Sequence, residues 1–203
     1  MKRRLLTGVG VAGIAATLIA TNMLPAGASA KKFTFSMVRS TAAVNAGCLV
    51  NAQATVTIKQ NELNETMMVH ASGLPHNTGF DLFVTQVPNA PFGVSWYQSD
   101  LQSDDQGDAD VKVIGRFNVE TFAVAPGTAA APNVHDGLDA TSNPPFMPVH
   151  TFHLGFWFNN PADAVAAGCP GNVTPFNGDH NAGVQAMSTR NFPDDQGPLR
   201  HVG

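Results

Sequence analysis

The chain has 203 residues, with 15 acidic and 11 basic side chains and a formal net charge of −4. Three of the basic residues lie in the first thirty positions, so residues 31–203 keep 8 basic against 15 acidic side chains, a difference of −7. Because residues 31–203 are acidic overall and keep no basic cluster, their charge argues against nucleic-acid binding and against a peripheral role on anionic lipid.

The first thirty residues have the three parts of a secretory signal peptide. A basic head, Lys2-Arg3-Arg4, precedes an apolar run over residues 5–24 and the small-residue sequence Ala28-Ser29-Ala30. This pattern predicts export and cleavage after Ala30, although a run of that length could also remain in the bilayer as an anchor. Residues 31–203 contain no other stretch apolar enough to cross a membrane, so we expect one secreted, extracellular domain.

Short segments in which apolar and polar residues alternate predict half-buried strands along the rest of the chain. The predicted strands cover residues 33–37, 53–59, 66–72, 80–87, 94–101, 109–124, 150–158 and 184–189. Turn-forming residues separate them, for example at 73–79 and 103–108. Strands at this spacing predict a mainly β fold, an antiparallel β-sandwich or barrel.

The remaining segments predict one short helix and long connections. Asn160 can cap a helix that starts at Pro161, runs through residues 162–167 and stops at Gly168. Residues 125–149 form a long Ala/Pro/Asn-rich loop, and residues 170–183 and 191–203 are polar and rich in turn formers. Loops of this length are usually functional or mobile.

The chain has two cysteines, Cys48 and Cys169. In an exported protein the expected state is a single disulfide between them. The alternative is a pair of free, buried thiols. Since no Cys-x-x-Cys motif is present, nothing in their spacing predicts redox catalysis or zinc binding.

His150 and His153 form a His-x-x-His sequence, whose two side chains could chelate one metal ion if the segment were helical. The surrounding phenylalanines recur at every second residue, which predicts a strand, and on a strand these two side chains point to opposite faces. A metal site is therefore still possible only with distant ligands, for which we name His153, Asp179 and His180. The alternative for Asp179 and His180 is an Asx-type turn with an exposed histidine.

Other sequence patterns give little support to catalysis. No Gly-x-Ser-x-Gly elbow is present, and the acidic run at 104–110 lacks the glycine and glutamate positions of an EF-hand, so we expect it to be a hairpin turn. Trp96 and Trp157 are candidates for stacking against a ligand such as a sugar ring, with core packing as the alternative. Because strand neighbours point oppositely, we expect only one of Trp96 and Tyr97 to lie outside.

The sequence ASGLPHNTGFDLFV at 71–84, followed by DQGDADV at 105–111, resembles the strand-turn-strand pattern of secreted bacterial β-sandwich domains, the CHRD-type domains among them. The His-x-His element associated with CHRD domains is absent, so the resemblance implies a fold and no ligand. The whole chain is also similar to uncharacterised secreted proteins of high-GC Gram-positive bacteria, which implies no activity.

These observations favour a secreted, non-catalytic protein with a binding or structural role outside the cell membrane. The expected partner is a cell-wall or other extracellular polymer, or a protein, and no cofactor is indicated. One alternative is a metal-binding protein that uses His153 and the Asp179–His180 loop. The other is an extracellular hydrolase of glycan or polymer, with the 125–149 loop as part of its cleft.

Overall fold

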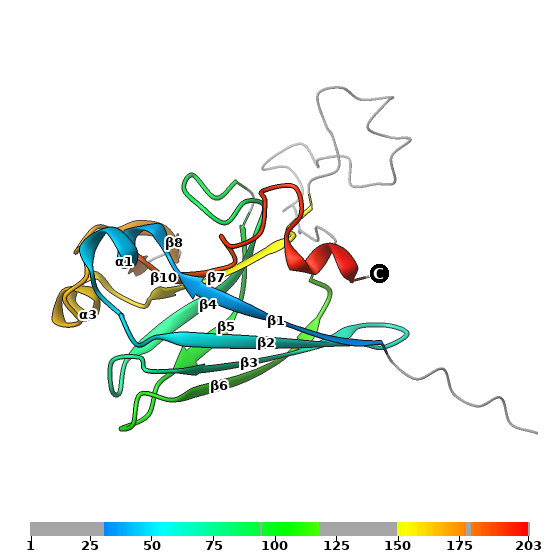
Figure 1. The fold of residues 1–203 in the computed structure, drawn as a ribbon, viewed down its shortest axis with the longest axis horizontal. Coiled ribbons are helices and arrows are strands. Elements are labelled where there is room, and N and C mark those ends of the chain that lie inside the picture. The colour runs from blue at the N-terminus through cyan, green and yellow to red at the C-terminus, as the bar shows by residue number, and fades with distance from the viewer. Residues whose placement is uncertain (1–30, 94, 118–149, 178–179, 203) are drawn as a thin grey trace, which may run out of the picture.

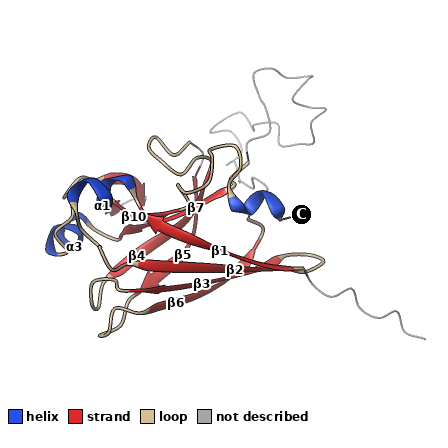
Figure 2. Cartoon of the chain, viewed as in Figure 1, coloured by secondary structure: helices blue, strands red, loops and turns tan. Residues whose placement is uncertain are grey.

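A computed structural model describes residues 31–93, 95–117, 150–177 and 180–202 of the chain. It is mainly antiparallel β, as predicted, with eight strands in one sheet in the order β5-β4-β7-β10-β1-β2-β3-β6 and a separate hairpin of β8 and β9 (Figures 1 and 2). The strands of the sheet are β1 (Lys32–Arg39), β2 (Gln53–Gln60), β3 (Glu65–Ser72), β4 (Gly79–Thr85), β5 (Ser95–Gln102), β6 (Ala109–Gly115), β7 (His153–Phe158) and β10 (Gln185–Ser188). The hairpin and the short helices are β8 (Thr174–Asn177), β9 (His180–Ala182), α1 (Thr41–Ala46), α3 (Pro161–Ala166) and the 3-10 helix η1 (Pro198–His201).

The sheet curls until its two edge strands, β5 and β6, approach each other. This nearly closed arrangement is the barrel-like form of the predicted fold class. The core of the sheet is formed by side chains that alternate in direction along each strand. On β3 the side chains of Met67, Val69 and Ala71 point inward and are fully buried, whereas the side chains between them are more exposed. Inward side chains from every strand of the sheet form one hydrophobic cluster.

Strand β7 lies between β4 and β10 in the middle of the sheet and is buried on both faces. Leu154, Phe156 and Phe158 join the interior core, whereas Trp157 belongs to a second cluster on the outer face with Phe83. The predicted two-faced strand is therefore confirmed. It begins at His153 rather than at residue 150, because residues 150–152 pair with no other strand among the described residues.

The helix after Asn160 is confirmed, since the Asn160 side chain accepts a hydrogen bond of 2.9 Å from the Asp163 N–H and Pro161 begins the helix. Helix α1 was not predicted, although its signals are in the sequence. The Ser40 hydroxyl caps the Ala43 N–H, and Gly47 ends the helix in the left-handed region at φ 70°. Among the described residues, no helix is long and apolar enough to span a bilayer.

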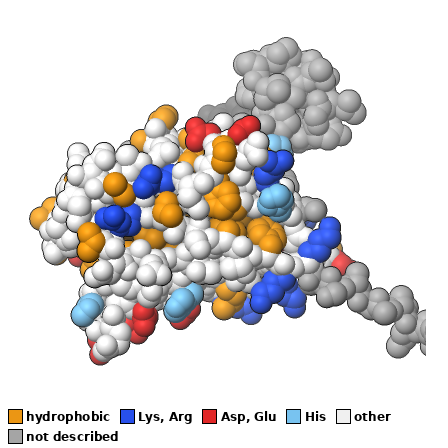
Figure 3. All heavy atoms as spheres, in the orientation of Figure 1, with side chains coloured by type: hydrophobic (Ala, Val, Ile, Leu, Met, Phe, Trp, Pro, Cys, Tyr) orange, Lys and Arg blue, Asp and Glu red, His pale blue; other side chains and the backbone are white. Residues whose placement is uncertain are grey.

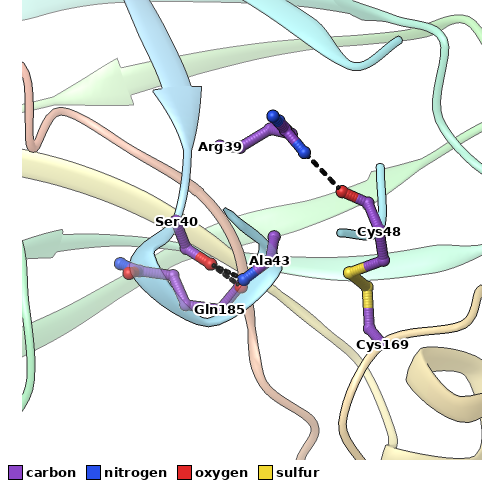
Figure 4. Close-up of a disulfide and its surroundings, with 6 residues drawn as sticks. All are labelled: Arg39, Ser40, Ala43, Cys48, Cys169 and Gln185. Carbon is purple, nitrogen blue, oxygen red and sulfur yellow. Dashed lines mark hydrogen bonds between the residues drawn. A yellow bond between two sulfur atoms is a disulfide. The ribbon is translucent and has the colours of Figure 1, made fainter. Parts of the chain in front are cut away.

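The predicted disulfide between Cys48 and Cys169 is present, with the two Cα atoms 5.4 Å apart (Figure 4). It joins the chain just after α1 to the chain just after α3, across a separation of 121 residues. These two helices and the β8–β9 hairpin gather at one end of the sheet, and η1 lies near the other end (Figure 1). The predicted signal peptide at 1–30, the predicted loop at 125–149 and residues 118–124 of the predicted strand at 109–124 lie outside the described residues.

Candidate functional site

His153 is fully buried, and both of its ring nitrogens make hydrogen bonds. Nε2 donates to the Asp194 carbonyl at 3.1 Å, so in the neutral ring Nδ1 accepts from the Thr189 hydroxyl at 2.9 Å. Burial lowers the pKa of His153, and the hydrogen bonds to its partners raise the pKa by less than burial lowers it. The imidazole thus ties β7 to the segments that follow β10, and neither nitrogen is available to a metal in this arrangement.

The other two predicted metal ligands, His180 and Asp179, and the neighbouring His150 are placed as follows. His180 is the first residue of β9, and Asp179 lies outside the described residues. His150 is exposed and stacks on Phe152, with ring centroids 4.9 Å apart. In the part of the chain that the structure describes, no three histidine, cysteine, aspartate or glutamate residues are close enough to hold a metal.

The acidic run at 104–110 forms a turn, as predicted, but the strands that it joins, β5 and β6, lie at opposite edges of the sheet and do not pair with each other, so the turn closes no hairpin. The Asp104 carboxylate accepts hydrogen bonds from the backbone N–H groups of Gln106 at 2.8 Å and Asp108 at 2.9 Å. These donors lower the pKa of Asp104. The carboxylate therefore closes its own turn.

Of the two tryptophans predicted to stack on a ligand, only Trp96 offers an exposed face. Trp157 is 0% exposed and packs edge-on against Phe83 and Phe92, at centroid distances of 5.5 and 5.0 Å. Trp96 and Tyr97 are 45% and 44% exposed, so the expectation that one of them is in the core is wrong. Their strand β5 forms an edge of the sheet and pairs with β4 through a register shift, which leaves both rings half-covered.

The second, outer-face cluster borders an open pocket of ≈ 460 Å³ at the helical end of the molecule. Its apolar lining residues are Ala42, Ala90, Phe92, Pro170 and Val184. Its polar lining residues all carry uncharged hydroxyl or amide groups: Thr41, Asn45, Asn89, Asn172, Thr174 and Gln185. None of these described lining residues is charged, so they offer a ligand apolar contact and neutral hydrogen bonding.

Gln185 is the polar residue of the pocket that is least exposed, at 5%. Its side-chain Nε2 is buried and has no hydrogen-bond partner among the described residues. Its backbone carbonyl accepts from the Ser40 hydroxyl, which also caps α1 (Figure 4). A buried amide donor that is left unpaired costs free energy, so native proteins rarely keep one without a role.

Gly155 makes room for this amide. A Cβ atom at position 155 would lie 2.5 Å from Gln185 Nε2 and 2.8 Å from the Trp157 ring. Glycine on β7 therefore lets both side chains pack across the outer face of the sheet.

The pocket walls are joined to one another by hydrogen bonds. The Thr41 hydroxyl at the start of α1 donates to Asn89 Oδ1 at 2.8 Å, and the Phe92 N–H donates to the Asn89 carbonyl at 2.9 Å. Pro170, on the opposite segment, directly follows the disulfide cysteine Cys169. The shape of the pocket is thus held before any ligand enters it, which lowers the entropic cost of binding.

A comparison with protein-family models and with curated proteins finds no match for this chain. The functional argument therefore depends on the pocket itself. Sequence reasoning missed Gln185 because a glutamine in a short apolar segment carries no local signal of a site.

Proposed function

We propose that this protein is a secreted, non-catalytic binding protein whose outer-face pocket takes an uncharged ligand. Nε2 is buried over Gly155, so the Gln185 amide would turn toward the pocket to donate to a hydrogen-bond acceptor of the ligand. An apolar surface of the ligand would lie against Phe92 and Val184. The observation that carries the proposal is the buried, unpartnered Nε2 beside the pocket. A carbonyl oxygen from a ligand would satisfy this donor and recover the free energy that its isolation costs.

An acetamido sugar of an extracellular glycan fits this description. Its amide carbonyl is a neutral acceptor, its methyl group is apolar, and the Asn45, Asn89 and Asn172 amides can bind sugar hydroxyl groups. The signal-peptide pattern and the Cys48–Cys169 disulfide support an extracellular location, where such polymers occur. The neutral lining of the pocket supports binding without turnover.

Tryptophan fluorescence can test this proposal because the chain has only two tryptophans. The variant Trp96→Phe leaves Trp157, whose ring lies 5.0 Å from the ring of Phe92 at the pocket. We expect oligomers of N-acetylglucosamine to change its emission in a saturable way, and glucose oligomers of equal length to have a weaker effect. Adding Gln185→Leu should abolish the response.

Three results would contradict the proposal. Equal responses to the two oligomer series would show that the acetamido group is not what the pocket recognises. Unchanged binding by the Gln185→Leu variant would show that Nε2 is not the hydrogen-bond donor to the ligand. Release of shortened products from the oligomers would favour the hydrolase alternative.

A further inference from the structure

A different part of the molecule, residues 32–37 of β1, has a sheet edge that no strand of the described residues covers. β1 pairs with β2 from Lys32 to Met37, but it pairs with β10 only at Val38 and Arg39. On the N-terminal side of Val38 the two strands separate. The edge of residues 32–37 that points toward β10 therefore faces no strand among the described residues.

The hydrogen-bond pattern shows which backbone groups face this edge. The Lys31 carbonyl accepts from the Gln60 N–H at 2.8 Å, so odd-numbered residues of β1 face β2. Even-numbered positions face the other side: the Ser40 N–H donates to the Ala186 carbonyl at 2.9 Å, and the Ser36 carbonyl accepts from Asn191 Nδ2 at 3.3 Å.

The N–H and C=O groups of Lys32 and Thr34 therefore point toward the open edge. They have no hydrogen-bond partner in the described part of the chain. Exposed groups of this kind form a template for another strand.

A groove of ≈ 680 Å³ lies beside this edge, between β1 and the C-terminal segment. Its floor is aromatic: Phe33 and Phe35 stack at 6.1 Å, and Phe192 packs edge-on against Phe35 at 6.3 Å. The His201 ring closes the far side against Phe33 at 6.1 Å, and the Gln60 side chain holds η1 there by donating to the His201 carbonyl. Figure 3 shows hydrophobic side chains gathered between basic and histidine side chains on this face.

The charge of the groove is opposite to that of the chain. Lys31, Lys32 and His201 line it, and none of its described lining residues is acidic, although residues 31–203 carry a difference of −7 between basic and acidic side chains. The lysines attract an acidic partner. They also disfavour pairing of two copies of β1, because edge lysines would then approach each other.

We propose that the open edge of β1 binds an extended, acidic peptide segment as an added strand. The backbone of the segment would pair with Lys32 and Thr34, an apolar side chain would enter the groove over Phe33 and Phe35, and acidic side chains would face Lys31 and Lys32. This is the β-augmentation mode of peptide recognition, in which main-chain bonds supply affinity and pockets supply selectivity. The proposal is independent of the outer-face pocket, since the two sites share no lining residue.

The test compares two synthetic peptides, acetyl-TEVEFE-amide and acetyl-TKVKFK-amide, in titrations of the purified protein followed by NMR. We expect the acidic peptide to bind and to slow hydrogen exchange of the Lys32 and Thr34 amides. The Phe33 and Phe35 amides already bond to β2 and serve as internal references.

Two matched pairs of variants sharpen the test. Thr34→Pro removes the edge N–H, whereas Thr34→Val keeps it, and both lose the same hydroxyl contact to Thr57. Proline is tolerated at an edge position whose N–H faces outward, and we expect it to weaken the acidic peptide by ~10-fold relative to valine. Lys32→Glu should weaken that peptide, whereas Lys112→Glu, at an exposed position on β6, should not.

Several outcomes would overturn the proposal. Equal affinity for the two peptides would exclude the charge argument, and equal affinity of the Thr34→Pro and Thr34→Val variants would exclude strand addition. Should the proline variant not fold, amide protection and the lysine pair still decide the question. Protection of Lys32 and Thr34 in a dimer without peptide would identify a second copy of the chain as the occupant.

Discussion

Gln185 Nε2 has no hydrogen-bond partner in the described part of the chain. Replacing the Gln185 side chain therefore measures whether this position serves stability or binding. Gln185→Leu replaces the amide with an apolar group of similar size at a position that is 5% exposed. An unsatisfied buried donor costs about 1–3 kcal/mol. If the outer-face pocket is empty, the variant should therefore have a free energy of unfolding that is higher by about 1–3 kcal/mol.

Urea unfolding at neutral pH, followed by circular dichroism, measures this difference, and the m-value should not change. Gln53→Leu is the matched control because Gln53 is exposed on β2, and we expect it to change stability by no more than about 0.5 kcal/mol. Added ligand should stabilise the native protein and leave Gln185→Leu unaffected. A residue that lowers stability and raises binding is typical of functional sites.

A loss of stability in Gln185→Leu would refute this reasoning. It would mean that Nε2 has a partner in solution, such as an ordered water molecule, and that the amide is part of the packing. The role assigned to it in the pocket would then be withdrawn.

Three other predictions concern the disulfide, the buried histidine and the single tyrosine. Replacing Cys48 and Cys169 with alanine should lower the free energy of unfolding by about 4–5 kcal/mol, because the bridge closes a loop of 121 residues. Thiols can also be titrated in the denatured, unreduced protein. Two free thiols in that titration would contradict the bridge. Burial lowers the pKa of His153, so as the pH falls the unfolded chain binds a proton at this residue before the folded chain does. The free energy of unfolding should therefore decrease below about pH 6.5. If the His153→Gln variant lost stability with pH in the same way as the wild-type protein, this prediction would be contradicted. Burial, together with the Asp100 carboxylate that accepts a hydrogen bond from the Tyr97 hydroxyl at 2.7 Å, raises the pKa of Tyr97 to about 12. Ultraviolet titration of this single tyrosine should give a pKa of about 12, and a lower pKa in the Asp100→Asn variant. The same pKa in both proteins would exclude the contact.

Much of the fold could be predicted from the sequence because its signals are local. Alternation on a strand depends on backbone geometry alone, so the phenylalanine pattern of β7 was sufficient to place Leu154 and Phe156 on one face and His153 and Trp157 on the other. The cap of α3 at Asn160 is equally local. The same kind of signal at Ser40 went unused, which is why α1 was missed.

The candidate sites could not be predicted in the same way. The outer-face pocket draws its lining from α1, the 89–92 turn, the 170–174 segment and the start of β10, which are distant in sequence. The β1 edge is open because β10 pairs only with the end of β1, and no residue of β1 carries that information. Such juxtapositions depend on how the strands are ordered in the sheet.

The sequence by itself determined the charge, the predicted export signal, most of the strands and the pairing of the two cysteines, since two cysteines allow only one intramolecular bridge. Only the tertiary structure decided what covers each face. It buried Trp157 beneath Phe92, used both nitrogens of His153 in hydrogen bonds, and left Gln185 Nε2 beside a pocket with no partner among the described residues. The physical reason is that side-chain direction follows from the local backbone, whereas burial and hydrogen-bond satisfaction depend on the neighbours that the rest of the chain brings.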